Sequence, residues 1–419
     1  MTVLESGPLG RQLAMAYSNR SQLHMLAGER ETAVTWGERA RTLADRLGDV
    51  ETSVHAAINV SSARLMDGDD GAIAALGEAH ERASSLGLAD HAARALVNLA
   101  TSLVELAEYG AALPAVERAL AYAVRHDLDG YVQYLLGVRA GVRLARCDWT
   151  GALADADAAL DRPVRGGVAV VPALVARGRI QAARGEPEAP ATLDEAARQA
   201  GRTGEVQRVC PVAAARSECF LWYGDAGRAA EEARRGLDLA MTVSHPVYVG
   251  ELAYRLWRAG GTGIPGAVAR PYQMMIDGDW AGAAAEWDRH GAGYARVEAL
   301  AGGDQGAAAE ALRVLDGLAA TRAAERLRAE LRGRGFTRVP RGPRRATAAH
   351  AAGLTPRQAE VLALLVEGLS NAEMAGRLSL SVKTVDHHIS AVLGKLGVSS
   401  RGQAAAAAHR LNLVRDPAN

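Results

Sequence analysis

The chain has 419 residues, enough for two or more domains, and it is rich in alanine, leucine, arginine and glycine but holds only 2 phenylalanines. This composition favours helices and argues against a β-rich core. The net charge is zero, but residues 332–419 carry 13 Lys and Arg against 5 Asp and Glu, a balance of +8, so the remaining residues carry −8. The basic C-terminal segment indicates a polyanionic partner, and the acidic residues before it indicate a different role for that part of the chain.

The three cysteines, Cys147, Cys210 and Cys219, are far apart, and none belongs to a CxxC pair. We therefore expect buried free thiols rather than a disulfide framework or a zinc finger. The N-terminus lacks a signal-peptide pattern, and no apolar run approaches the roughly 20 residues that span a bilayer. These features predict a soluble cytoplasmic protein that neither enters a membrane nor needs a metal or cofactor.

Residues 1–331 contain a repeat. Each unit has a turn residue, followed five positions later by a small or apolar residue, and the first six turn residues are 40, 39, 40, 38 and 39 positions apart. The pairs are Gly28 with Ala33, Gly68 with Ile73, Ala107 with Ala112, Cys147 with Ala152, Gly185 with Pro190, Gly224 with Ala229, Gly278 with Ala283, and Gly303 with Ala308. A steady period of this length predicts a helical solenoid, in which each unit buries its apolar face against its neighbours.

The pattern inside a unit is a helix, a short polar turn and a second helix. Ala93–Leu106 has apolar residues at helical spacing, and Ala112–Ala123 repeats that spacing after the turn AEYG. This resembles the tetratricopeptide class, with helices longer than in its common version of about 34 residues. The resemblance implies an all-α interaction domain at residues 1–331, whose inner surface takes a ligand or a protein partner.

The period fails between Gly224 and Gly278, which are 54 positions apart. The cluster Gly260–Gly266 predicts a loop there, and we interpret the region as a bend or a cap. A phosphate-binding loop is the alternative, but the segment lacks the Lys-Ser/Thr ending and a preceding strand. Gly278 and Gly303, only 25 positions apart, predict a compact terminal cap.

Residues 332–353 predict a linker, because glycines, two prolines and six arginines within this span argue against a packed element. Two interpretations remain open. The linker is either a solvated tether or a tether whose arginines also contact phosphates.

Residues 354–419 predict a separate head of four helices. Thr355, Pro356 and Gln358 supply a cap, a first-turn proline and a capping-box partner, so the first helix begins here and continues to about Glu367. Ser370 or Asn371 begins a second helix, and Ser381 begins a third. The expected buried residues of the first two helices are Val361, Leu362, Leu364, Leu365, Met374, Ala375 and Leu378.

The third helix divides into two faces on a helical wheel. Its core stripe is Val385, Ile389, Val392 and Leu396, and its outer face is Lys383, His387, Ser390 and Gly394. The outer face is polar or small, which suits entry into a major groove about 12 Å wide. Lys383 and Lys395 are the only lysines in the chain. Lys383 is the first residue of the outer face. Lys395 lies near the end of the helix, where a phosphate contact is expected.

The segment GLSNAEMAGRLSLSVKTVDHH, with KLGV further on, resembles the LuxR/GerE/NarL-type helix-turn-helix of bacterial transcription regulators over roughly residues 354–410. The resemblance implies that the face from Lys383 to Ser390, with His387, reads bases. It implies that phosphates, or the helix ends near them, are held by Thr355, Asn371, Ser381, Thr384, Lys395 and Arg401. It also implies that the fourth helix, Gly402–Leu411, dimerises through Gln403, Ala404, Ala407 and Ala408.

One position departs from that family pattern. Asp386 stands where many members carry lysine or arginine, and an aspartate cannot bind phosphate but can accept a hydrogen bond from cytosine N4. We interpret this as an altered base preference and include Asp386 among the DNA-binding residues. The next residue but one, His388, is expected to face the core side, and the His387–His388 pair offers too few ligands for a metal.

The repeats and head together resemble the C-terminal half of large MalT-like LuxR regulators, which place an ATPase before such a sensor. The Walker pattern is absent here, and we therefore expect a natural short form, a split gene or a fragment. The sequence predicts a sequence-specific DNA-binding transcription regulator whose partners are double-stranded DNA, a second copy on DNA, and an unknown ligand or protein on the repeats. RNA polymerase is a further candidate partner.

Two other functions agree with parts of the sequence. In the first, the protein is an interaction scaffold whose head mainly dimerises, which Asp386 and the low lysine count favour slightly. In the second it is an ATPase or signal hydrolase, but no paired carboxylates, nucleophile elbow or phosphate loop stand out in the sequence. We therefore expect no catalytic residues.

Overall fold

The computed structural model describes residues 9–162, 167–266, 268–342, 354–411 and 413. These residues are helical with connecting turns, and no strand occurs among them. The helices of the repeat region are α2 Arg11–Leu26, α3 Arg30–Arg46, α4 Val50–Met66, α5 Gly71–Ser85, α6 Ala89–Glu105, α7 Tyr109–Arg125, α8 Asp129–Ala145, α9 Trp149–Leu160, η1 Val168–Val170, α10 Val171–Arg184, α11 Ala189–Ala200, α12 Val206–Tyr223, α13 Ala226–Thr242, α14 Pro246–Arg258, α15 Arg270–Asp277, α16 Trp280–Arg289, α17 Gly293–Ala301, α18 Gln305–Gly317 and α19 Thr321–Gly333. The head contains α21 Pro356–Val366, α22 Asn371–Leu378, α23 Val382–Leu396 and α24 Arg401–Arg410.

The chain divides into two compact units, Met1–Ala311 and Leu312–Asn419, and the division falls inside α18. The expected domain boundaries, after residue 331 and before residue 354, stay predictions. Half of the expected linker, residues 343–353, lies outside the described residues.

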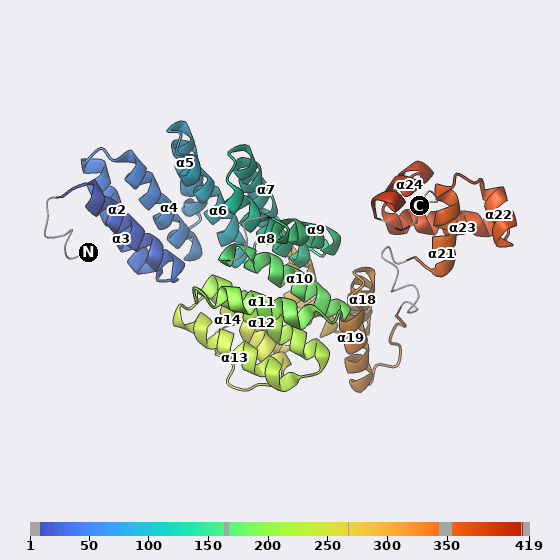
Figure 1. Ribbon diagram of the computed structural model, residues 1–419. Helices are drawn as coiled ribbons and strands as arrows, with labels where there is room; N and C mark the ends of the chain where they lie inside the picture. The colour runs from blue at the N-terminus through green and yellow to red at the C-terminus, as the bar shows by residue number, and fades with distance from the viewer. Residues whose placement is uncertain (1–8, 163–166, 267, 343–353, 412, 414–419) are drawn as a thin grey trace. The chain divides into compact units, whose positions relative to one another are not determined.

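The predicted turn residues end the first helix of each repeat. Gly28, Gly68, Gly185, Gly224 and Gly278 all have positive φ, between 77° and 86°. Glycine suits these positions because it has no Cβ to clash in the left-handed region. Ala107 and Cys147 take the same conformation, with φ of 60° and 66°. The helices follow one another as antiparallel pairs in chain order (Figure 1), so the all-α repeat architecture is confirmed.

The small residue after each turn is buried in most repeats. Ala33, Ala112, Ala152, Ala229, Ala283 and Ala308 are almost completely buried. Two repeats differ by one position: Ile73 is 42% exposed while Ala72 is buried, and Pro190 is half-buried while Ala189 is buried. In both second helices the alanine one position earlier is the buried residue.

The irregular region after Gly224 contains α14, which packs against α13 and α15, and a loop. α14 ends at Arg258, residues 261–266 form an irregular loop, and α15 to α17 are short. These short helices contact the turns of earlier repeats: the Gly110 amide donates to the His290 carbonyl at 3.1 Å, and the Tyr294 ring lies 5.5 Å from that of Trp149. The expected bend is thus a segment that folds back onto the third and fourth repeats.

Buried charges fix this arrangement. The Arg179 Nε donates to Glu218 Oε2 at 2.8 Å, the Tyr294 hydroxyl donates to Glu218 Oε1 at 2.9 Å, and Arg255 Nη2 donates to Glu298 Oε2 at 2.9 Å. Burial alone would raise the pKa of Glu218, but the guanidinium groups of Arg179 and Arg255 hold it below its ordinary value. Four helices, α10, α12, α14 and α17, therefore share one ionic network.

The first and sixth repeats also touch. Arg30 Nη2 donates to the Val243 carbonyl at 3.2 Å, and a Cβ added to Gly28 would lie only 3.0 Å from the Val243 Cβ. The turn between α2 and α3 therefore rests on the turn between α13 and α14. Because these turns meet, the inner sides of the intervening repeats face one another across a cavity.

Cys147 is half-buried, Cys210 and Cys219 are buried, and all three are free thiols. Burial raises the pKa of the Cys210 thiol to about 12. Within the ranges that the structure describes, no helix is both long and apolar enough to cross a membrane.

Candidate nucleic-acid interface

Hydroxyl caps begin all four helices of the head. Thr355 caps α21 in a capping box, accepting from the Gln358 amide at 3.2 Å while Gln358 Oε1 accepts from the Thr355 amide at 3.0 Å. Ser370, not Asn371, caps α22, again in a capping box, which resolves the choice that the sequence left open. Ser381 caps α23 and Ser400 caps α24. Each cap fixes where its helix starts and hence which side chains face outward.

The core of the head follows the predicted stripes. Val361, Leu362, Leu364, Leu365, Met374, Ala375, Val385, Ile389 and Val392 are buried in one cluster. Leu378 and Leu396 are only half-buried at its edge. The α22–α23 turn passes through Ser379 in the left-handed conformation, with φ of 54°. These contacts hold α23 on top of α21 and α22.

The opposite face of α23 is open. Lys383, His387, Ser390 and Gly394 are exposed, as is Asp386 at their flank. Among the described residues, the side chains of Lys383, His387 and Ser390 have no hydrogen-bond or ion-pair partner. An outward face with donors that no protein group occupies is free to bind an external acceptor.

Thr355 and Lys395, predicted as phosphate-holding residues, lie together at one end of this face. Lys395 Nζ donates to Gln358 Oε1 at 2.8 Å, the same oxygen that accepts from the Thr355 amide. Burial lowers the pKa of Lys395. Gln358 therefore couples the start of α21 to the end of α23.

Asn371, Asp386 and Arg401 form a second cluster. Arg401 Nη1 donates to Asn371 Oδ1 at 2.7 Å and its Nη2 donates to the Leu369 carbonyl at 2.5 Å, while Asn371 Nδ2 lies 3.4 Å from Asp386 Oδ1. Arg401 thus ties α24 to the start of α22. Asp386 remains exposed and keeps an oxygen with no partner in the described part of the head.

The remaining two predicted positions lie at the start of α23. Ser381 Oγ accepts from the Thr384 amide at 3.1 Å and lies 2.8 Å from Thr384 Oγ1. His388 is half-buried, on the core side as expected.

No group of three or more His, Cys, Asp or Glu side chains suited to a metal occurs among the described residues.

The dimer contact expected of the fourth helix stays a prediction. Ala404, Ala407 and Ala408 are buried within the head itself, and Ala404 and Ala408 belong to its core cluster. Their side chains therefore pack inside the head. Gln403 is exposed; its Oε1 accepts from the Ser399 amide at 3.0 Å. The small alanines let α24 approach α21 closely rather than a partner helix.

Two residues near the interface were not singled out from the sequence. The Arg357 guanidinium donates to the Leu378 carbonyl and lies 2.5 Å from Glu360, so it joins α21 to the turn before α23. Val382 begins α23 and is 50% exposed beside Lys383. The helical wheel places Val382 outside the core stripe, which is the only signal of its exposure.

The head matches a known family. Residues 352–408 match the model described as bacterial regulatory proteins, luxR family. Over 61 residues the chain is 49% identical to the transcriptional regulatory protein LiaR of Bacillus subtilis, covering 15% of this chain and 29% of that protein. Over 96 residues it is 40% identical to the DNA-binding transcriptional activator DevR/DosR of Mycobacterium tuberculosis, covering 23% and 40%. The head is therefore a LuxR-family helix-turn-helix domain.

A third relative covers the repeats as well. The HTH-type transcriptional regulator Mb0914c of Mycobacterium bovis is 25% identical over 417 residues, which is 90% of this chain and 42% of that protein. The chain thus spans less than half the length of this relative. A solved circular tandem repeat protein aligns with 77% of this chain and 94% of its own length, at 15% identity and a TM-score of 0.26. That score is too low to relate the two folds.

Proposed function

We propose that the chain is a sequence-specific, DNA-binding transcription regulator whose repeat domain senses a ligand or protein partner and which acts in the cytoplasm. The observation that carries the proposal is the open face of α23, with Lys383, His387 and Ser390 unpaired in a head of the LuxR family. The relatives with similar heads bear the names of transcription regulators, which supports the same role here.

In this proposal the contacts divide by type. Lys383 donates to guanine O6 or N7, Asp386 accepts from cytosine N4, and the exposed Val382 contacts a thymine methyl. Thr355 and Lys395 at one end, and the Asn371–Arg401 pair at the other, position the head on the phosphates. Two copies bind adjacent half-sites, and their contact uses exposed residues of α24 such as Gln403 rather than the buried alanines.

The test begins by selecting genomic fragments that the full chain binds. Affinity for the selected operator is then measured by fluorescence anisotropy for Lys383→Ala and His387→Ala. We expect each variant to lose roughly 5- to 150-fold in specific affinity, as is usual for about 1–3 kcal/mol per base contact. Arg82→Ala, which removes an exposed charge from α5, is the matched control and should bind as the parent does.

Two results would contradict the proposal. If both α23 variants bind the operator as tightly as the parent, α23 does not read the bases. If the full chain selects no DNA even at low salt, the head is an interaction module, as in the scaffold alternative.

A further inference from the structure

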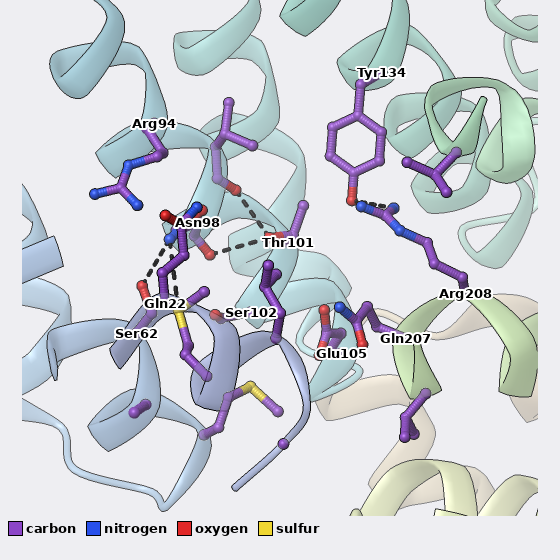
Figure 2. A pocket seen from close by; sticks show the side chains of 18 of the residues that line it. Gln22, Ser62, Arg94, Asn98, Thr101, Ser102, Glu105, Tyr134, Gln207 and Arg208 are labelled. Carbon is purple, nitrogen blue, oxygen red and sulfur yellow. Dashed lines mark hydrogen bonds between the residues drawn. The ribbon is translucent and has the colours of Figure 1, made fainter. Parts of the chain in front are cut away.

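The first unit contains a cavity of about 530 Å³. Residues of α2, α4, α6 and α8 line it, together with the start of α12 (Figure 2). The turn before α14 also contributes to the lining. The contact between Arg30 and Val243 closes one edge of it. The volume lies in the range of small-molecule and short-peptide sites, and the lining is more polar than a packing defect would be.

One face of α6 supplies a row of polar and charged side chains to this cavity. Arg94, Asn98, Thr101 and Glu105 follow one another at spacings of four, three and four, so they form a stripe along the helix. All four line the cavity. The other positions of α6, such as Leu96, Leu99 and Leu103, are buried in the repeat core. The stripe is therefore a polar face turned toward the cavity.

Arg94 supplies a positive charge at one end of the stripe. It is 7% exposed, and its two terminal nitrogens donate to neutral oxygens: Asn59 Oδ1 at 2.9 Å and the His55 carbonyl at 3.0 Å. Its Nε has no hydrogen-bond partner. The carboxylate of Asp90, which also lines the cavity, interacts with Arg94 electrostatically, but no carboxylate of the described residues forms an ion pair with it. Burial lowers the pKa of this guanidinium to about 10. A buried cation with no carboxylate in direct contact favours an anionic group nearby.

Glu105 supplies a negative charge at the other end. His245 Nε2 lies 3.6 Å from Glu105 Oε2, too far for a hydrogen bond. The guanidinium of Arg208, which lines the same cavity, interacts electrostatically with Glu105 but forms no ion pair with it. His245 Nδ1 accepts from the Tyr248 amide at 3.3 Å. No lysine or arginine pairs with Glu105 within 4 Å. A carboxylate in this position favours a donor or cation from a ligand.

Amide side chains surround the space between these ends. Gln22, Asn98 and Gln207 enter it from α2, α6 and α12 (Figure 2). Asn98 Nδ2 donates to Ser62 Oγ at 2.9 Å, while its Oδ1 accepts from no described group. A primary amide both donates and accepts, and so matches the alternating N–H and C=O groups of a peptide backbone.

We propose that this cavity binds a short peptide with free ends, its carboxylate beside Arg94 and its ammonium beside Glu105. The proposal rests on the sensing role given to the repeats above and names the class of ligand. From Arg94 to Glu105, α6 rises about 16 Å. That distance corresponds to roughly five extended residues, so we expect tetrapeptides and pentapeptides to bind best.

The experiment exposes the immobilised full chain to mixed tetrapeptides and pentapeptides with free ends. It repeats the exposure with the same mixtures acetylated at the N-terminus, amidated at the C-terminus, or both. Bound peptides are identified by mass spectrometry, and the most enriched is synthesised for titration calorimetry. We expect each single block to weaken binding about 10-fold or more. The blocks test both ends of the site without altering the protein's fold.

Protein variants complete the test. Glu105→Gln keeps the size of the side chain and should weaken binding of the free peptide about 10-fold, yet bind the acetylated peptide as the parent does. Glu81→Gln, on the exposed side of α5, is the matched control and should bind as the parent does. Equal capture of free and doubly blocked peptides, or equal binding by Glu105→Gln, overturns the inference.

Failure here is distinct from failure of the proposed function. DNA binding of the parent chain is measured separately without peptide. If the chain binds its operator but captures no peptide, only the ligand class is wrong. If it captures peptide but binds no DNA, only the proposed function is wrong.

Discussion

At the scale of single residues, His55 shows how burial sets a charge state. It is 8% exposed, and its Nδ1 lies 2.6 Å from the Ser18 hydroxyl. Burial, together with the nearby Arg94 and His91, lowers the pKa of His55 to about 3. The folded protein therefore holds this ring neutral, whereas the unfolded chain takes up a proton below about pH 6.5.

This difference predicts acid sensitivity of the repeat domain. Because the unfolded state binds the extra proton, the contribution of His55 to stability is complete above pH 6.5 and falls as the pH drops toward 3, by up to about 1.4 kcal/mol per unit. The free energy of unfolding, measured with urea, should fall between about pH 7.5 and 5.5. This fall should be roughly 1 kcal/mol larger in the parent than in His55→Gln. Equal losses in the two proteins would show that His55 titrates normally.

Some residue roles were readable from the sequence and others were not. Thr355, Ser381 and the outer face of α23 follow from local spacing, because caps and helical faces depend on neighbours in the chain. The phosphate contact expected of Arg401 stays a prediction, and in the structure Arg401 also holds Asn371 and the Leu369 carbonyl. That role depends on residues some thirty positions away, which spacing alone does not bring together.

At the scale of helices, the repeats are packed through small residues. Gly236 of α13 is buried between its neighbours: an added Cβ would lie 2.7 Å from the Ala213 Cβ of α12 and 2.8 Å from a Leu252 methyl of α14. Neither helix can move away without disturbing the next pair. The close approach of these three helices therefore requires a residue without a side chain.

Gly236→Ala should accordingly destabilise the protein by about 1–3 kcal/mol, although alanine is the better helix former. The matched control is Gly77→Ala in the middle of α5, where an added Cβ meets nothing within 4 Å. That change should stabilise by about 0.5–1 kcal/mol, because only the helix propensity differs. Thermal or urea unfolding measures both. Gly236→Ala as stable as Gly77→Ala would mean that the helices separate freely.

The period of the repeats predicted the paired helices well. It did not predict how the helices after α14 pack against the earlier repeats. The turns at Gly28 to Gly224 form by local rules, and their positive φ values agree with the markers. The return of α15 to α17 onto α8 depends on ion pairs such as Arg255 with Glu298, whose members are 43 positions apart. A repeat pattern reflects contacts between neighbouring repeats, so it does not predict contacts between repeats that are far apart in the chain.

At the scale of the whole molecule, charge is divided between the two ends of the chain. The +8 of residues 332–419 attracts DNA, while the −8 of the preceding residues repels it. The affinity for DNA should therefore fall steeply with salt, because each neutralised phosphate releases counterions. Within the described part of the linker, Arg338 and Arg341 are exposed and have no ion-pair partner. They are free to contact phosphates beside the operator.

We predict that the double variant Arg338→Gln/Arg341→Gln flattens the plot of log affinity against log salt by up to roughly two units, since each phosphate contact contributes about 0.9. Discrimination between operator and random DNA should stay the same, because these contacts carry no sequence information. The control Arg46→Gln/Arg82→Gln removes two exposed arginines from the repeats, α3 and α5, and leaves the slope unchanged. An unchanged slope in the linker variant would make the linker a solvated tether, and an equal change in the control would assign the effect to net charge alone.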